Sequence, residues 1–180
     1  MPFAAGGSLT RWLGAGGLSV KAAVGVLHAV LAAVEHLHAL RIVHRDVKSD
    51  NILVAVNGAV AIADFGLGAV LDSGPGAVRK TVLGTPSWMA PEVIRGVPYG
   101  TAADVWSVGV LAIELVDGAP PWLDLPIHTA LERVLSAEPP TPLRTVPPEY
   151  SAFVRAALVK DPAARPTAAS LRAHPLFIAV

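Results

Sequence analysis

Four polar residues in the first half of the chain have types and a spacing that can support transfer of a phosphoryl group. Asp46, Lys48 and Asn51 belong to the polar segment 44–51, and Asp64 follows it. Such a transfer needs an oriented hydroxyl, positive charge near the transferred group and oxygen ligands for Mg²⁺. Asp46 can orient the hydroxyl and accept its proton, and Lys48 can neutralise the phosphoryl oxygens. The oxygens of Asn51 and Asp64 are suitable ligands for the metal.

Each of these residues also has a structural interpretation. A lone Asp in a loop commonly caps a helix or a turn, Asn51 can form an Asx turn, and Lys48 can be an exposed charge. Considered singly, the structural interpretations are favoured. The four residues at this spacing together favour the catalytic one.

The elements next to this segment indicate how distant residues can meet. Ile52–Ala55 and Val60–Ala63 are short apolar runs, and the Asn-Gly pair between them is a strong hairpin signal. Asn51 lies where the first strand starts and Asp64 follows the second. The hairpin is therefore expected to bring both side chains to the same end of one small sheet.

Most of the remaining chain is predicted to be helical. Apolar residues at three-and-four spacing predict a helix that follows the N-cap Ser19 and ends near Leu40. Thr101 is expected to cap a second helix, which ends at Gly118. Shorter helical segments are expected at Leu9–Leu13, Tyr150–Lys160 and Thr167–Ala173. Residues 64–92 have no clear period, and a loop of that length is expected to be functional or disordered.

Composition excludes several classes of protein. The chain has 180 residues, with 14 Lys and Arg against 14 Asp and Glu, so it lacks the basic surplus of a nucleic-acid-binding domain. The absence of cysteine excludes disulfides, thiolate catalysis and cysteine-ligated zinc. The length suits a single domain or one lobe of a larger domain.

Two apolar stretches could be mistaken for membrane spans. Residues 22–40 are interrupted by His28 and Glu35, and residues 105–116 are short and contain Glu114. Both are interpreted as core helices of a protein with no membrane partner. The chain is expected to be soluble and cytoplasmic, although its mean hydropathy of +0.53 is high and suggests exposed apolar surface.

Three motifs, in this order, resemble the catalytic core of eukaryotic-type protein kinases. They are His-Arg-Asp-Val-Lys-Ser-Asp-Asn at 44–51, Asp-Phe-Gly at 64–66 and Ala-Pro-Glu at 90–92. The Lys of the first motif resembles Ser/Thr kinases. Residues 84–94 resemble the STE group, which includes the MAP kinase kinase kinases, except that Ser87 replaces an aromatic residue common there. The resemblance implies a signalling enzyme that uses ATP and Mg²⁺, a protein substrate, and a possible upstream kinase or regulator.

The resemblance also implies roles for individual residues. Those implied to contact substrate, ATP or Mg²⁺ are Asp46, Lys48, Asn51, Leu53, Asp64 and Thr85, with Asn51 and Asp64 as the metal ligands and Thr85 touching Asp46 and Lys48. Arg45 is implied to hold a phosphate on Thr81, the expected regulatory site, although Thr81 can equally be an ordinary loop hydroxyl.

Structural roles are implied for five further residues. His44 is expected to pack against Phe65, and Asp104 to accept hydrogen bonds from the loop backbone. Arg165 is expected to pair with Glu92.

The small N-terminal lobe that begins such kinases has no counterpart in these 180 residues. A Gly-rich phosphate loop, a strand Lys and its helical Glu partner are all missing from the sequence. The fold is therefore expected to be a mainly α, kinase-like large lobe over 1–180, with one small β-hairpin sheet. We expect weak ATP binding and a fragment of a longer kinase. The alternatives are a non-catalytic binding module and an inactive remnant.

Overall fold

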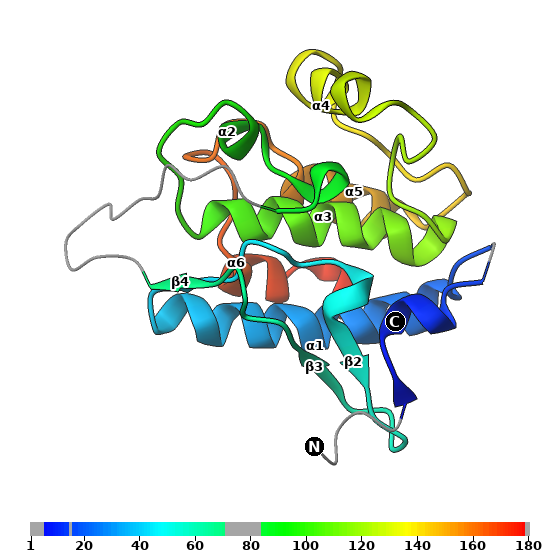
Figure 1. Cartoon of the computed structure of the whole chain (residues 1–180). Helices are drawn as coiled ribbons and strands as arrows, with labels where there is room; N and C mark the ends of the chain where they lie inside the picture. Colours follow the sequence, from blue (N-terminus) through cyan, green and yellow to red (C-terminus); the bar gives the residue numbers. More distant parts are fainter. Residues whose placement is uncertain (1–5, 15, 71–83, 179–180) are drawn as a thin grey trace.

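Two long helices cross the molecule one above the other (Figure 1). They belong to a computed structural model that describes residues 6–14, 16–70 and 84–178. The helices are α1 (Val20–Ala39) and α3 (Ala102–Asp117). They pack against each other, α1 also against α6 (Ala168–Arg172) and α3 also against α5 (Pro148–Ala157). Their facing side chains form the main hydrophobic core.

Helix α1 forms where the apolar spacing predicts it. The Ser19 hydroxyl caps its first turn by accepting a hydrogen bond from the Ala22 amide at 3.3 Å. The predicted apolar face is buried, with Leu27, Leu31 and Val34 fully enclosed. Both ends of this helix and its inward face are therefore confirmed.

By length and composition alone, α1 could cross a membrane. Its Leu27, Leu31 and Val34 are each 0% exposed inside the protein core. Core helices of soluble proteins satisfy the same test, so α1 is weak support for a membrane span.

Helix α3 is the most deeply buried element of the described chain. Every residue from Ala103 to Val116 is buried, as expected for a core helix. Gly118, at a φ of 87°, ends the helix in the left-handed conformation that favours glycine. The expectation that the Thr101 side chain caps the helix is wrong. Thr101 has helical backbone angles, so its hydroxyl makes no capping hydrogen bond.

The remaining helices are short and surround this pair. The predicted helix at Tyr150–Lys160 begins earlier, since Pro148 has the φ that a first helical residue requires, and it ends earlier, at Ala157. The other α-helices are α2 (Pro91–Ile94) and α4 (Ile127–Ser136). The 3₁₀ helices include η2 (Leu9–Trp12), η3 (Ser49–Asn51), η4 (Pro86–Trp88) and η5 (Pro175–Phe177).

The predicted hairpin is confirmed. Strands β2 (Ile52–Val54) and β3 (Val60–Ile62) are antiparallel, with Leu53 opposite Ala61. The turn between them closes with the Gly58 amide donating to the Ala55 carbonyl oxygen at 2.9 Å. Gly58 has a φ of 82°, which explains the requirement for glycine there.

The expectation of only one small sheet is wrong. Strand β1 (Ile42–Val43) pairs antiparallel with β4 (Ala69–Val70) and forms a second two-stranded sheet. Two-residue strands carry too little alternation to be recognised in a sequence, and this pairing joins segments that are distant along the chain. Part of the expected 64–92 loop is thus a strand, and its end is helical in η4 and α2.

Arg165, which lies between α5 and α6, forms a buried ion pair with Glu92 of α2. Arg165 Nη1 donates to Glu92 Oε1 at 2.7 Å, and Nη2 donates to Oε2 at 3.1 Å. The two side chains are 0% and 3% exposed. The guanidinium also donates to three backbone carbonyl oxygens and lies 5.3 Å from the centre of the Trp106 ring. All five N–H donors of the guanidinium are therefore satisfied inside the protein.

Replacing Arg165 with Ala is expected to lower the free energy of unfolding by about 3–5 kcal/mol, because it leaves a buried carboxylate uncompensated. The control is Arg155→Ala, which removes an exposed Arg from α5. Urea unfolding followed by circular dichroism measures both. Equal stabilities of the two variants would contradict the prediction.

Candidate active site

The backbone of the segment 44–46 is held by one buried carboxylate of α3. Asp104 Oδ2 accepts a hydrogen bond from the His44 amide at 2.9 Å, and Oδ1 accepts one from the Arg45 amide at 2.8 Å. The His38 Nε2 atom lies 2.8 Å from the same Oδ2. Arg45 has a φ of 72°, which is unusual for a residue other than glycine. The two hydrogen bonds stabilise that conformation and thereby set the direction in which Asp46 leaves the loop.

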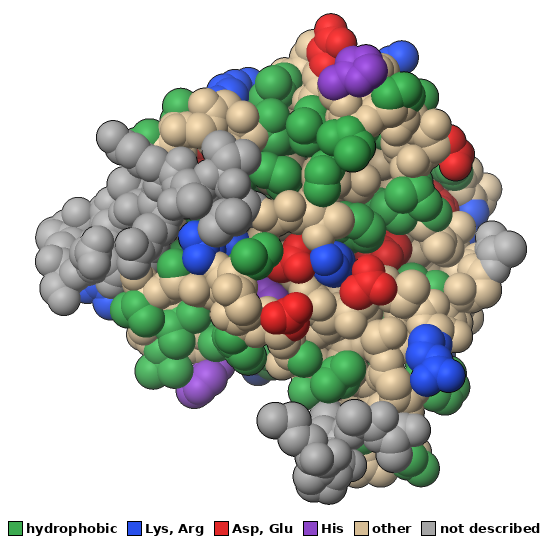
Figure 2. Space-filling view, in the orientation of Figure 1, with side chains coloured by type: hydrophobic (Ala, Val, Ile, Leu, Met, Phe, Trp, Pro, Cys, Tyr) green, Lys and Arg blue, Asp and Glu red, His purple; other side chains and the backbone are tan. Residues whose placement is uncertain are grey.

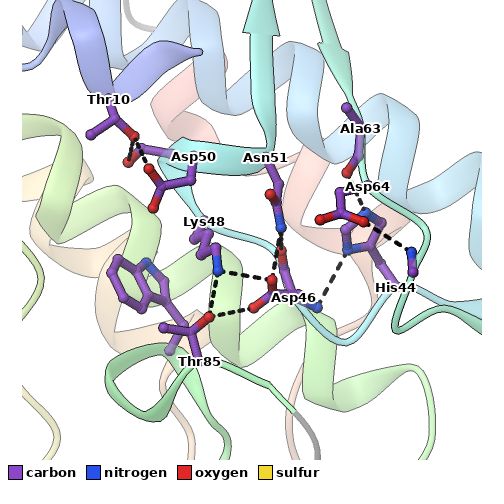
Figure 3. A network of polar contacts seen from close by, with 12 residues as sticks. Thr10, His44, Asp46, Lys48, Asp50, Asn51, Ala63, Asp64 and Thr85 are labelled. Atoms are coloured by element: carbon purple, nitrogen blue, oxygen red, sulfur yellow. Dashed lines mark hydrogen bonds and ion pairs between the residues drawn. The ribbon is translucent and has the colours of Figure 1, made fainter.

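Asp46, Lys48 and Thr85 form a closed triangle of polar contacts (Figure 3). Lys48 Nζ lies 2.9 Å from Asp46 Oδ2 and donates to Thr85 Oγ1 at 2.5 Å. The Thr85 hydroxyl donates to Asp46 Oδ1 at 2.7 Å. The structure thus brings together three residues that the sequence analysis places in one site, although Thr85 lies far along the chain.

The donors around Asp46 favour its charged form. Burial raises the pKa of the Asp46 carboxyl, but hydrogen bonds from Lys48 and Thr85, the charge of Lys48 and a hydrogen bond from Asn51 outweigh it. The pKa is therefore lower than usual, and near neutral pH the group is a carboxylate. It can orient a hydroxyl strongly, while its basicity is low.

The Asp46 carboxylate retains room for one more donor. A carboxylate has about four lone-pair positions. Lys48 and Asn51 contact Oδ2, and Thr85 contacts Oδ1. One position, on Oδ1, therefore has no donor among the described residues.

Asn51 and Asp64 lie at the same end of the β2–β3 hairpin, as predicted. The Ala63 amide donates to the Asn51 carbonyl oxygen at 2.8 Å, which makes Asp64 the next residue beyond that pairing. The Asn51 amide nitrogen donates to the Asp46 carbonyl oxygen and to Asp46 Oδ2, both at 2.8 Å. The Asn51 side-chain oxygen must then point away from Asp46 (Figure 3).

Asp64 is exposed and forms a local turn. Its Oδ1 accepts a hydrogen bond from the Gly66 amide at 3.1 Å, and its φ is 61°. This Asx turn corresponds to the turn-capping role that the structural interpretation gives to a lone Asp. The turn occupies one carboxylate oxygen and leaves Oδ2 available for a further partner.

His44 connects the two loops. Its Nδ1 accepts a hydrogen bond from the Asp46 amide at 3.3 Å, and its Nε2 lies 3.0 Å from the Ala63 carbonyl oxygen. The His44 and Phe65 rings meet edge to face, with centroids 5.2 Å apart. Phe65 remains 51% exposed, so only part of its surface is covered by this contact.

The other implied residues lie outside the triangle. Leu53 is half-buried in β2 and forms an isolated β-bridge with Ser8. Arg45 has a buried Nε atom without a hydrogen-bond partner among the described residues. Thr81 lies outside the described residues. Asp104 accepts hydrogen bonds from the loop backbone, and the Arg165–Glu92 pair contributes to packing.

Five residues near the site form polar contacts that the sequence analysis did not predict. The Ser49 hydroxyl donates to Glu114 Oε1 at 2.5 Å, and Trp88 Nε1 donates to Glu114 Oε2 at 3.0 Å. The Thr10 hydroxyl lies 2.7 Å from Ser49 Oγ and donates to Asp50 Oδ1 at 2.9 Å. Burial raises the pKa of Glu114, opposed by these hydrogen bonds from Ser49 and Trp88. A charged residue within the apolar run 105–116 was the available signal.

The surface over this cluster is charged. Figure 2 shows acidic and basic side chains gathered side by side on the middle of the face, with hydrophobic side chains above and below them. Within the described part of the chain, no group of three or more His, Cys, Asp or Glu side chains could hold a metal ion by itself. A metal here would also need ligands such as the Asn51 amide, water or a bound phosphate.

Comparison with known proteins gives consistent matches to one family. Residues 1–177 match the protein kinase domain family. The chain is 41% identical over 179 residues to the serine/threonine-protein kinase PAK mbt of Drosophila melanogaster and 42% identical over 179 residues to PAK 4 of Homo sapiens. It is 38% identical over 186 residues to the serine/threonine-protein kinase fray1 of Dictyostelium discoideum.

Each of these similarities covers 98% of this chain but only 28%, 30% and 32% of the respective relatives. The chain thus spans about a third or less of the length of the curated relatives it matches. The family match nevertheless runs over nearly all of its residues and includes the Asp46–Lys48–Thr85 triangle. The chain belongs to the protein kinase domain family.

Proposed function

We propose that the chain is the larger, C-terminal lobe of a protein serine/threonine kinase, and that it transfers the γ-phosphoryl group of ATP to a protein hydroxyl. The observation that carries the proposal is the triangle of Asp46, Lys48 and Thr85. Asn51 donates a hydrogen bond to Asp46, and Asp64 lies at the same end of the hairpin as Asn51. Relatives that share nearly the whole chain are serine/threonine kinases.

In this mechanism Asp46 binds the substrate hydroxyl. The free position on Oδ1 accepts the hydroxyl hydrogen, and the fixed carboxylate aims the oxygen at the phosphorus. The proton of that hydroxyl moves to Asp46 as the bond from its oxygen to the γ-phosphorus forms and the bond from the phosphorus to ADP breaks, so that ADP leaves. Lys48 lies 2.9 Å from Asp46 and supplies positive charge beside the transferred group.

The residues present fit a magnesium-bound nucleotide. The Asn51 side-chain nitrogen donates to Asp46, and its oxygen has no partner among the described residues. Asp64 retains an oxygen beyond its Asx turn. Magnesium takes one or two protein oxygens and completes its shell with phosphate oxygens and water. Bound there, it would neutralise phosphate charge. Leu53, half-buried on β2, is proposed to contact the base of ATP.

The assignment to the larger lobe rests on the helical content and on the motifs. The described residues are mainly helical with two two-stranded sheets. The similarity to kinases named PAK supports the expected STE-like subgroup. We propose protein partners with Ser or Thr acceptors, an upstream kinase or regulator, and a cytoplasmic location without a nucleic-acid or membrane partner.

The substitution Asp46→Asn tests the catalytic assignment. It keeps the size of the side chain but removes the charge that orients the hydroxyl, and it should reduce phosphoryl transfer by about 10²–10⁴-fold. The assay follows transfer from radiolabelled ATP to a Ser/Thr protein substrate, using the longest protein that the gene encodes. Asp124→Asn, at an exposed position, is the matched control. Undiminished transfer by Asp46→Asn would refute the proposal. A parent protein that neither binds ATP nor transfers phosphate would favour a non-catalytic binding module.

The isolated 180-residue chain is expected to bind Mg-ATP weakly. It contains no Gly-rich loop and no strand Lys for the phosphates, so only part of the nucleotide surface is contacted. A dissociation constant above about 1 mM, or about −4 kcal/mol, is expected from isothermal titration calorimetry. Micromolar affinity would contradict the assignment to a single lobe.

Arg45 and Thr81 are proposed to form a phosphorylation switch. The buried Arg45 Nε has no partner among the described residues, and an Arg fork matches a phosphate. Incubation of the active protein with ATP, followed by phosphopeptide mapping, should locate phosphate on Thr81. Thr81→Ala should lower activity in the parent protein and have little effect when Arg45 is already Ala. Full activity without phosphate on Thr81 would exclude the switch.

A further inference from the structure

We infer that Glu114 is a positioning residue that couples the loop carrying Asp46 and Lys48 to the segment carrying Thr85. The inference rests on the proposed function for its catalytic meaning. Glu114 belongs to α3 and is 4% exposed. It lies outside the catalytic motifs, and none of the assigned roles involves it.

One side of the Glu114 carboxylate holds the loop. Its Oε1 accepts the Ser49 hydroxyl at 2.5 Å, and its Oε2 lies 3.4 Å from the Ser49 amide. Ser49 is 0% exposed and directly follows Lys48. A shift of Ser49 must therefore move the backbone from which the Lys48 side chain reaches Asp46 and Thr85.

The other side of the carboxylate holds the segment after Thr85. Its Oε2 accepts the Trp88 indole N–H at 3.0 Å. Trp88 ends the short helix η4, and its carbonyl oxygen accepts the Ser107 hydroxyl at 2.8 Å. The indole is 8% exposed, so water cannot readily replace Glu114 as its acceptor.

The two segments are therefore tied at two levels. At the surface, Thr85 bridges Asp46 and Lys48. Below it, Glu114 bridges Ser49 and Trp88. Ser49 is one residue after Lys48, and Trp88 is three residues after Thr85. A loss of the lower bridge leaves the upper one to hold both backbones alone. Glu114 thus sets the geometry of the triangle without touching the reacting atoms.

The chemistry of the bridge requires a carboxylate. All three neighbouring groups are N–H or O–H donors, and Glu114 supplies only acceptors. Gln would place an N–H₂ group against at least one of these donors. Because the site is buried, the unmatched donor would destabilise the bridge instead of finding water.

Hydrogen–deuterium exchange of the 180-residue chain tests the coupling without any kinase activity. Glu114→Gln should accelerate amide exchange by about tenfold in peptides covering 46–51 and in peptides covering 85–89. Exchange in α6, which packs against α1, serves as the reference for global stability. Glu132→Gln, at an exposed position of α4, is the matched control.

Two single substitutions distinguish coupling from local support. Ser49→Ala removes one contact of Glu114, and Trp88→Phe removes the other. With coupling, each substitution accelerates exchange in both segments, and the double variant differs from the sum of the two. Acceleration confined to the substituted segment, with additive effects, would overturn the inference, as would unchanged exchange in Glu114→Gln. If Glu114→Gln accelerates exchange in α6 as well, the two single substitutions decide.

Kinetics in the longest encoded protein then test the catalytic meaning. Glu114→Gln should lower kcat about tenfold while the KM for ATP changes less than about twofold, because only the hydroxyl-aiming geometry is disturbed. Equal losses in Glu114→Gln and Glu132→Gln would overturn the positioning role. If the parent protein transfers no phosphate at all, the proposed function fails, and the exchange experiment still decides the coupling.

Discussion

The geometry of the site depends on hydrogen bonds from the buried helix α3 to the loop that begins at His44. The Asp104 carboxylate accepts two backbone amides, from His44 and from Arg45, whose φ is 72°. A left-handed conformation at such a residue costs about 1–3 kcal/mol. A hydrogen bond to a charged acceptor contributes about 1.5–3 kcal/mol, so the pair can stabilise the turn. Without Asp104, the loop would relax and Asp46 would lose its direction.

Two further polar residues of α3 face the same region. Asp104, Ser107 and Glu114 follow the helical repeat of about 100° per residue closely enough to share one face, while the rest of the buried helix is almost entirely apolar. Ser107 holds the Trp88 carbonyl, and Glu114 holds the Trp88 indole and Ser49. One helix therefore holds both segments of the candidate site, and the spacing of its polar residues sets how the two segments lie relative to each other.

Sequence could predict those parts of the fold and site that are local. The hairpin, the capped helix α1 and the juxtaposition of Asn51 with Asp64 follow from turn chemistry and periodicity within about a dozen residues. The β1–β4 sheet and the Ser49–Glu114 contact join residues that are far apart, and no local pattern specifies such pairings. The hydrogen bond from the Trp88 indole to Glu114 could not be predicted, because an indole N–H acquires a partner only after the chain has folded. Thr81 lies outside the described residues, and its role stays a prediction.

Local contacts bring the polar side chains of the site together, and long-range contacts fix their geometry. Asp46, Lys48 and Asn51 lie within six consecutive residues, so their side chains meet through contacts that are local in the sequence. The contacts with Thr85 and with α3 join distant parts of the chain. Thr85 lies 39 residues from Asp46, and Glu114 lies 65 residues from Ser49. Closing such loops costs conformational entropy that must be offset by burial. Substitutions of the polar α3 residues should consequently change the geometry of the site without removing any of the side chains that form it.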